Sequence, residues 1–153
     1  LSRMSSSDDQ SYLKHITVKS CPQTDEFWLM MRTELPTLLD NGSYSVLVLD
    51  SIADMFRLPS EDSTVSPAFS RAMNVLAAAA ELLRLADNHN LAAIVINQLS
   101  FSEPALGLAW RHCVHNTFML SESRNISLKK SLEHSTDVRA KYEIASDGVY
   151  LAS

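Results

Sequence analysis

An uninterrupted apolar run that ends in an aspartate constrains the fold of this chain more than any other feature. Residues 46–49 read VLVL, and Asp50 follows them directly. Four consecutive aliphatic residues are typical of a parallel strand that is buried on both faces, so we expect a central strand of an α/β sheet here. A carboxylate at the carboxyl end of such a strand lies where open α/β sheets bind ligands, so Asp50 is a candidate ligand of Mg²⁺ or of its bound waters.

A second apolar run, AAIVIN, spans residues 92–97 and is followed by Gln98. A polar residue at a strand end is by itself more commonly a cap than a ligand. The segment before this run, residues 67–90, is rich in Leu and Ala and predicts a long helix. Apolar residues that recur at helical spacing are expected to form its buried stripe: Phe69, Met73, Leu76, Ala80 and Leu83.

The order of four sequence blocks resembles the RecA-type recombinases, and within them the eukaryotic paralogues that support homologous recombination. The blocks are LVLDSIADMFR, INQL, PALGLAW and YEIASDGV, and the resemblance covers residues 16–151. It implies an α/β fold, namely the carboxyl-terminal half of a RecA-like P-loop NTPase core. That core would hold a mainly parallel sheet flanked by helices, with a closing antiparallel hairpin. Residues 12–153 would form this partial core, and residues 1–11 would be a flexible tail or linker.

The same resemblance assigns candidate site residues. Asp50 matches the Walker B aspartate, with Ser51 beside it, and Gln98 matches the glutamine that senses the terminal phosphate of the nucleotide. The implied cofactors are ATP and Mg²⁺, with Asp50 holding the metal through water. Arg57 and Arg71 bracket a loop that faces DNA in the family and match basic positions there, although solvated arginines at helix ends explain them equally well.

One part of a nucleotide site is missing from the sequence. No G-x-x-x-x-G-K-[ST] loop occurs, and the only glycines are Gly42, Gly107 and Gly148. That loop supplies the backbone amides, the lysine and the hydroxyl that hold the phosphates and Mg²⁺. We therefore expect no ATPase activity from the chain alone. Because the chain starts with Leu, we expect a fragment or a processed product. Because the loop is missing, we expect either that the rest of the core was lost or that this half is a degenerate paralogue that docks onto a partner.

The charge balance limits the possible contact with nucleic acid. The formal net charge is -5, and phosphate binding depends on concentrated Lys and Arg. Residues 99–103 alone separate Gln98 from Pro104, whereas strand-exchanging recombinases carry a long DNA-binding loop at this point. We therefore expect an accessory protein of homologous-recombination DNA repair. Its partners would be other recombinase paralogue subunits, and it would bind DNA weakly through a local patch.

Neither a membrane span nor a signal peptide is expected, because no apolar run approaches eighteen residues. Two cysteines in unrelated contexts favour a reducing, intracellular compartment, and the resemblance implies the nucleus. The spacing of His112, Cys113 and His115 matches no standard zinc pattern, so coincidence is the better explanation.

Two other functional classes stay open at this point. One is a non-catalytic scaffold or interaction module built on a degenerate RecA half. The other is a fragment of a different P-loop ATPase, such as a hexameric helicase or a kinase. The blocks PALGLAW and YEIASDGV weigh against this last class.

Local patterns predict the remaining elements. We expect a strand over residues 12–19, and then a helix with Thr24 as its N-cap and a kink or restart at Pro36. Asn41 and Gly42 should end that helix with a left-handed residue.

Near the end of the chain, a helix is expected over residues 105–115, beginning at or just before Pro104. Strands are expected over residues 117–120 and 142–145, with a tight turn at residues 146–148.

Overall fold

Two parallel strands, β1 (Val46–Asp50) and β2 (Ala92–Ile96), form the centre of the larger of two compact units of the chain. This computed structural model describes residues 10–56, 66–100, 103–136, 138–146 and 148–152. The larger unit spans Cys21–Val114, and the smaller comprises Leu1–Ser20 and His115–Ser153. The two strands pair in register from Val46↔Ala92 to Asp50↔Ile96, so they end at the same edge. Both predicted strands are confirmed.

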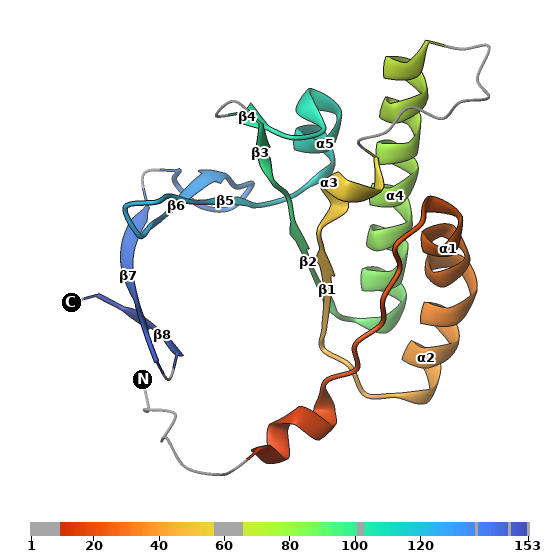
Figure 1. Ribbon diagram of the computed structural model, residues 1–153, viewed down its shortest axis with the longest axis horizontal. Coiled ribbons are helices and arrows are strands. Elements are labelled where there is room, and N and C mark those ends of the chain that lie inside the picture. The colour runs from red at the N-terminus through yellow and green to blue at the C-terminus, as the bar shows by residue number, and fades with distance from the viewer. Residues whose placement is uncertain (1–9, 57–65, 101–102, 137, 147, 153) are drawn as a thin grey trace. The chain divides into compact units, whose positions relative to one another are not determined.

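Helices cover one side of this strand pair (Figure 1). They are α1 (Thr24–Leu29), the π-helical turn η2 (Met30–Glu34), α2 (Leu35–Asn41) and α4 (Pro67–His89), and two further helices, α3 (Ile52–Met55) and α5 (Gly107–Cys113), complete the unit. Buried apolar side chains from these helices and from the residues beside them form one cluster: Phe27, Met31, Leu35, Leu39, Ile52, Phe56, Val75, Ala78, Ala79, Leu82, Leu85, Leu91 and Trp110. Burial of each large aliphatic side chain stabilises the fold by about 1.5–3 kcal/mol, so the stability of this unit comes mainly from the helix-covered side.

The first helical segment keeps its apolar side chains on one face by changing its pitch. Phe27, Met31, Leu35 and Leu39 are buried at intervals of four residues. A spacing of four drifts around a regular α-helix of 3.6 residues per turn, and the wider π turn at η2 corrects part of this drift. The predicted restart is confirmed, because α2 begins directly after η2 with Pro36 in its first turn.

Two predictions about the ends of this segment are wrong. The N-cap is Gln23, and Thr24 is already helical because its hydroxyl donates instead to the carbonyl of Met55 at 3.1 Å. Gly42 ends α2 as predicted, but in an extended conformation with φ of -126° and not in a left-handed one.

The predicted buried stripe of α4 is also wrong. Phe69 and Met73 are 58% and 50% exposed, and Leu76, Ala80 and Leu83 are exposed as well. The residues that pack on the sheet lie on a neighbouring face of the helix: Val75, Ala78, Ala79, Leu82 and Leu85. Because α4 has two apolar faces, helical spacing alone does not decide which of them is buried.

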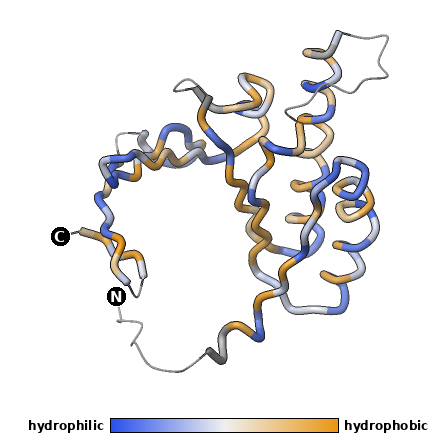
Figure 2. Tube along the Cα trace, viewed as in Figure 1, coloured by the Kyte–Doolittle hydropathy of each residue, from blue (hydrophilic) through white to orange (hydrophobic). Residues whose placement is uncertain are grey.

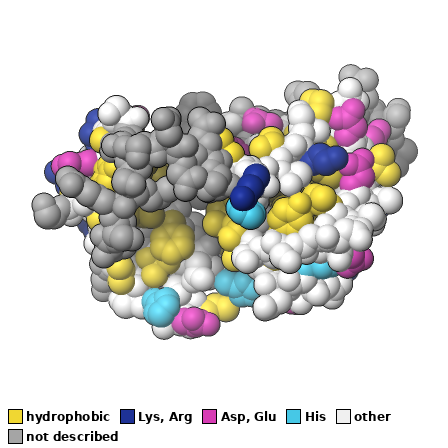
Figure 3. All heavy atoms as spheres, turned by 90° about the horizontal axis from the view of Figure 1, so that it is seen from below, with side chains coloured by type: hydrophobic (Ala, Val, Ile, Leu, Met, Phe, Trp, Pro, Cys, Tyr) yellow, Lys and Arg dark blue, Asp and Glu magenta, His cyan; other side chains and the backbone are white. Residues whose placement is uncertain are grey.

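The strand β1 is not buried on both faces. Val46 and Val48 are 50% and 55% exposed, and Ile94 and Ile96 of β2 are 51% and 43% exposed. Leu47 and Leu49 point the other way and pack against the helices. Apart from Asp50 at the end of β1, both strands consist of hydrophobic residues, which Figure 2 colours orange, and hydrophobic side chains also reach the surface in the space-filling view of Figure 3. The prediction failed because the described residues supply helices for one side of these strands only.

The smaller unit contains a short 3-10 helix and a four-stranded antiparallel sheet. The helix η1 (Gln10–His15) replaces the strand predicted over residues 12–19, since within the described residues this segment pairs with no strand. The sheet runs in the order β5-β6-β7-β8, and its strands are β5 (Thr117–Leu120), β6 (Asn125–Lys130), β7 (Arg139–Ala145) and β8 (Gly148–Leu151). The predicted closing hairpin is confirmed as β7 and β8, whereas β6 was missed because its sequence is largely polar.

Most strands in the described part of the chain pair in an antiparallel way, so the expected mainly parallel sheet is too narrow a description. The observed fold is a mixed α/β one with a parallel and an antiparallel sheet. The 23 residues of α4 make it the longest helix of the described residues, and none of those helices is both long and apolar enough to cross a membrane. The predicted tail falls largely on residues 1–9, which lie outside the described residues.

Candidate functional site

Three polar side chains meet where β1 and β2 end. The hydroxyl of Ser51 donates to Oδ2 of Asp54 at 2.7 Å. The side-chain amide of Gln98, Nε2, lies 3.3 Å from Ser51 Oγ and 3.4 and 3.3 Å from the two carboxylate oxygens of Asp54. A carboxylate only accepts and an amide nitrogen only donates, so the direction of every bond in this ring is fixed. We call Ser51, Asp54 and Gln98 the strand-end cluster.

The first half of the cluster depends on the short helix α3. Ser51 is extended and occupies the N-cap position of α3, but its side chain bonds to Asp54 and not to a backbone amide. Ile52 and Ala53 are fully buried and fix one side of α3, which leaves Asp54 exposed on the other. The Thr24 hydroxyl is not part of the cluster, but it donates to the carbonyl of Met55, the last residue of the same helix. Asp54 is therefore held by an anchored helical turn.

The second half depends on the segment that follows β2. Asn97 Nδ2 donates to the carbonyl of Ala105 at 2.7 Å, and the Ala105 amide donates to the carbonyl of Gln98 at 2.8 Å. Between them lies a short hairpin of β3 (Leu99–Ser100) and β4 (Glu103–Pro104). The backbone at Gln98 is thus fixed on both sides. Pro104 belongs to β4, so the prediction that it begins a helix is wrong, and α5 starts after Leu106, whose φ is 72°.

Asp50 lies at the same edge but outside the ring of hydrogen bonds. Its side chain is exposed and shares the uncovered side of β1 with Val46 and Val48, because side chains alternate along a strand. The peptide bond between Asp50 and Ser51 is cis. The structure therefore joins two of the three predicted nucleotide-site residues, Ser51 and Gln98, and places the third at the end of the same strand.

The two predicted DNA-facing residues are not part of this geometry. Arg57 lies outside the described residues. Arg71 is exposed in the second turn of α4. Sequence reasoning missed Asp54, although the spacing S-x-x-D after a predicted strand is a known signal for a helix start and marks a polar pair at positions 51 and 54.

The strand end fits one half of a Mg²⁺-nucleotide site. Mg²⁺ is usually bound through one or two carboxylates and keeps several waters, and Asp50 is an exposed carboxylate of this kind. The described residues contain no group of three or more His, Cys, Asp and Glu side chains that would enclose a metal. The part of such a site that binds the phosphates is missing from the sequence, because none of the three glycines belongs to a phosphate-binding loop.

Cys21 does not have an activated thiol. Neither Cys21 nor Cys113 is in a disulfide within the described residues, and both are half-buried. Burial raises the pKa of the Cys21 thiol, and the carboxylates of Glu26 and Glu34 raise it further. A higher pKa means less thiolate at neutral pH, so Cys21 is a poor nucleophile.

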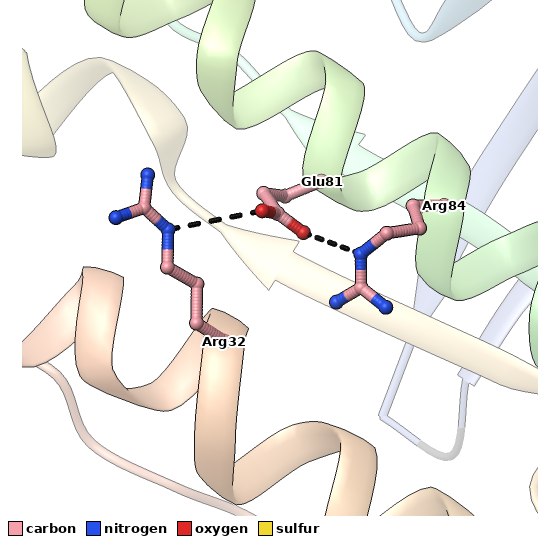
Figure 4. A network of polar contacts seen from close by, with 3 residues as sticks. All are labelled: Arg32, Glu81 and Arg84. Carbon is pink, nitrogen blue, oxygen red and sulfur yellow. Dashed lines mark hydrogen bonds and ion pairs between the residues drawn. The ribbon is translucent and has the colours of Figure 1, made fainter.

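A charged network links η2 to α4 on the helical side. Glu81 accepts from Nε of Arg84 at 2.7 Å and pairs with Nε of Arg32 at 3.7 Å (Figure 4). The Arg32 guanidinium also lies 4.7 Å from the centre of the Trp28 ring. Trp28 in turn neighbours Phe27 and Phe56, with ring centres 5.2 and 6.3 Å away. This network is structural, since it ties the outer helices together.

No protein family matches the sequence in a scan against family models, and no curated protein sequence matches it. The fold, in contrast, is similar to a solved structure described as the crystal structure of the RadB recombinase, with a TM-score of 0.52 and 18% sequence identity. The similarity covers 78% of this chain and 58% of the RadB chain, so the chain spans little more than half of that protein. This likeness shows the fold alone, and that fold is RecA-like.

Proposed function

We propose that this chain is the carboxyl-terminal half of a RecA-type ATPase core from an accessory paralogue of homologous-recombination DNA repair. The observation that carries the proposal is the strand-end cluster, in which Ser51 and Gln98 meet at the carboxyl edge of two parallel strands in register. Open α/β folds bind nucleotides at such an edge. The similarity of fold to the RadB recombinase supports the choice of family.

In this proposal each residue of the strand end has a separate role. Asp50 holds Mg²⁺ through water, Ser51 supports that edge, and Gln98 detects the terminal phosphate of ATP. Bound ATP and Mg²⁺ would supply the phosphoryl chemistry. The phosphate-binding loop would have to come from a further segment or from a partner subunit, because the chain has none.

The proposed partners are other recombinase paralogue subunits, and the proposed compartment is the nucleus. DNA would be bound weakly through a local patch that includes Arg57 and Arg71. The short β3–β4 connection after Gln98 and the net charge of -5 support a weak DNA contact.

A hydrolysis assay tests the first part of the proposal. The isolated chain is expected to hydrolyse ATP no faster than buffer, because it lacks the phosphate-binding loop. Robust Mg²⁺-dependent turnover by the purified chain would contradict this proposal.

Substitutions in a complex that contains the phosphate-binding loop test the site. Asp50→Ala is expected to reduce nucleotide-dependent assembly on the order of tenfold, since it removes a group that positions Mg²⁺. Gln98→Ala should leave nucleotide binding largely intact but uncouple it from engagement of DNA or partner. Asp40→Asn, on α2, serves as a control. Wild-type behaviour of both site variants would remove the assignment.

Thermal unfolding with added partners tests the proposed binding to recombinase paralogue subunits. A subunit that binds only the native state raises the apparent stability by mass action, so a recombinase paralogue should raise the Tm. Duplex DNA should raise it far less. A Tm that no recombination partner changes would count against the proposal.

A non-catalytic scaffold is the second candidate function, and the exposed apolar residues of β1 and β2 favour it. In that case partner binding would be independent of ATP. The Asp50→Ala variant separates the two candidates, because a scaffold would bind its partner equally well with this substitution.

A further inference from the structure

We propose that Asp54 is a positioning residue that holds Gln98 in the nucleotide-free chain. The inference concerns regulation of the strand-end site and rests on the proposed function for its consequence, but not for its geometry. Asp54 is absent from the residues that the sequence blocks assign to the nucleotide. The structure nevertheless places its carboxylate within hydrogen-bond distance of both Ser51 and Gln98.

The contacts hold the side chain of Gln98 in one position, but only weakly. Its backbone is held by the bonds through Asn97 and Ala105, so the freedom that remains lies in the side chain. The Nε2 bonds of 3.3 to 3.4 Å to Ser51 and Asp54 are long compared with the usual range of about 2.7–3.2 Å. By contrast, the Ser51–Asp54 bond of 2.7 Å is short. The Asp54 carboxylate is thus well anchored, and Gln98 is the member of the ring that can leave.

This asymmetry makes the contact a latch. A ligand that engages the Gln98 amide must compete with Asp54, because Nε2 already donates to that carboxylate. If this contact reduces the fraction of protein that is competent to bind, the apparent affinity for the ligand falls by the same factor. Removal of Asp54 should therefore make Gln98 respond at lower nucleotide concentration, whereas removal of Gln98 should abolish the response.

The direct test is NMR of the side-chain amides of the whole chain. The sequence has only three glutamines, Gln10, Gln23 and Gln98, so the Gln98 signal can be assigned from its loss in Gln98→Ala. In the wild type we expect solvent exchange of the Gln98 amide protons to be roughly three- to tenfold slower than that of the exposed Gln23, as the modest net strength of an ordinary hydrogen bond allows.

Substitutions then identify the group that slows the exchange of the Gln98 amide protons. Asp54→Ala should remove most of the difference from Gln23, since the 3.3 Å contact of Gln98 with Ser51 is retained. Asp54→Asn, which keeps one acceptor oxygen, should restore part of it. Asp40→Asn makes the same change of charge on α2 and should leave the Gln98 signal unchanged. Backbone amide spectra show that each variant is folded. Rapid exchange of Gln98 in the wild-type chain, or slow exchange that persists in Asp54→Ala, would overturn the latch.

A second measurement follows the consequence in a complex that contains the phosphate-binding loop, with Mg²⁺ and a non-hydrolysable ATP analogue as the probe. Asp54→Ala should lower the half-saturating analogue concentration for partner engagement by the same factor of roughly three to ten. A higher half-saturating concentration would instead make Asp54 part of the ligand site and overturn the latch. If the NMR result holds while Asp50→Ala and Gln98→Ala leave the complex unchanged, the latch stands and the proposed function fails.

Discussion

The two sheets of this chain differ in what covers them. The parallel pair β1 and β2 has helices packed on one side, and all but one of the buried apolar residues of the described chain lie in this unit. The antiparallel sheet β5–β8 contributes a single buried apolar side chain, Leu128, although it carries Phe118, Leu120 and Ile144. The comparison shows that alternating or continuous apolar residues make a strand but do not make a core. A core needs a second layer, and among the residues that the structure describes only the helices of the larger unit supply one.

The largest expected effect is a difference between two identical substitutions. Leu85→Ala removes a side chain that is fully buried, and Leu120→Ala removes one that is 60% exposed. We expect Leu85→Ala to lower the free energy of unfolding by about 2–5 kcal/mol. Leu120→Ala should lower it by less than about 1 kcal/mol, as measured by urea denaturation. Equal losses would show that another part of the protein covers the antiparallel sheet.

Hydrogen exchange should reveal the same difference without any substitution. Backbone amides of α4 face a packed core, whereas those of β8 pair only with β7 at the edge of a sheet. We expect local opening of β8 to cost about 1–3 kcal/mol less than opening of α4, so its amides exchange faster. If β8 is protected as strongly as α4, the two units unfold together.

Substitutions on the uncovered side of β1 and β2 should change the stability less, but they should measurably change self-association. Val48 and Ile94 are directly paired on that side, while Val95 points toward the helices. Combined Val48→Thr and Ile94→Thr should change the free energy of unfolding by less than about 1 kcal/mol and reduce self-association in sedimentation, because they add polar groups to an apolar patch.

The matched control for this pair is Val95→Thr. It places a hydroxyl on the packed side and should destabilise the chain by about 1–3 kcal/mol. A destabilisation by the Val48 and Ile94 substitutions as large as this would mean that the exposed side is covered in solution.

The smallest effect is expected for the charged network. Glu81→Gln removes the negative charge shared by Arg32 and Arg84 but keeps one acceptor oxygen, and both arginines are exposed. Because solvent screens such pairs, we expect a loss of about 0–1 kcal/mol in thermal unfolding, and less at high salt. A loss of several kcal/mol would make this network as important as the apolar core.

The parts of the fold that the sequence predicted are those that local chemistry decides. The run before Asp50 and the run before Gln98 form strands, and their parallel pairing brings Ser51 and Gln98 together. Pro36 restarts a helix because its ring excludes a regular helix interior. In each case the residues themselves limit the backbone to one outcome.

The parts that failed depend on partners distant in the sequence. The choice between the two apolar faces of α4 is made by β2 and by the helical segments that pack on α4, namely α2, η2 and α5. The exposure of Val48 is decided by a layer that β1 does not encode. Asp54 was missed because its importance comes from Gln98, a residue joined to it only in the folded chain. The S-x-x-D spacing at positions 51–54 signals a helix start, but it does not show that Asp54 meets Gln98.

The aromatic group beside α3 makes the strand end optically visible. Phe56 directly follows α3, its ring lies 6.3 Å from that of Trp28, and Thr24 ties α1 to Met55. Trp28 and Trp110 are the only two indoles, so in Trp110→Phe the fluorescence of the chain comes from Trp28 alone. Any displacement of the short helix that carries Asp54 changes the surroundings of this indole. The chain thus contains its own spectroscopic probe of its ligand-binding edge, with no need for a dye.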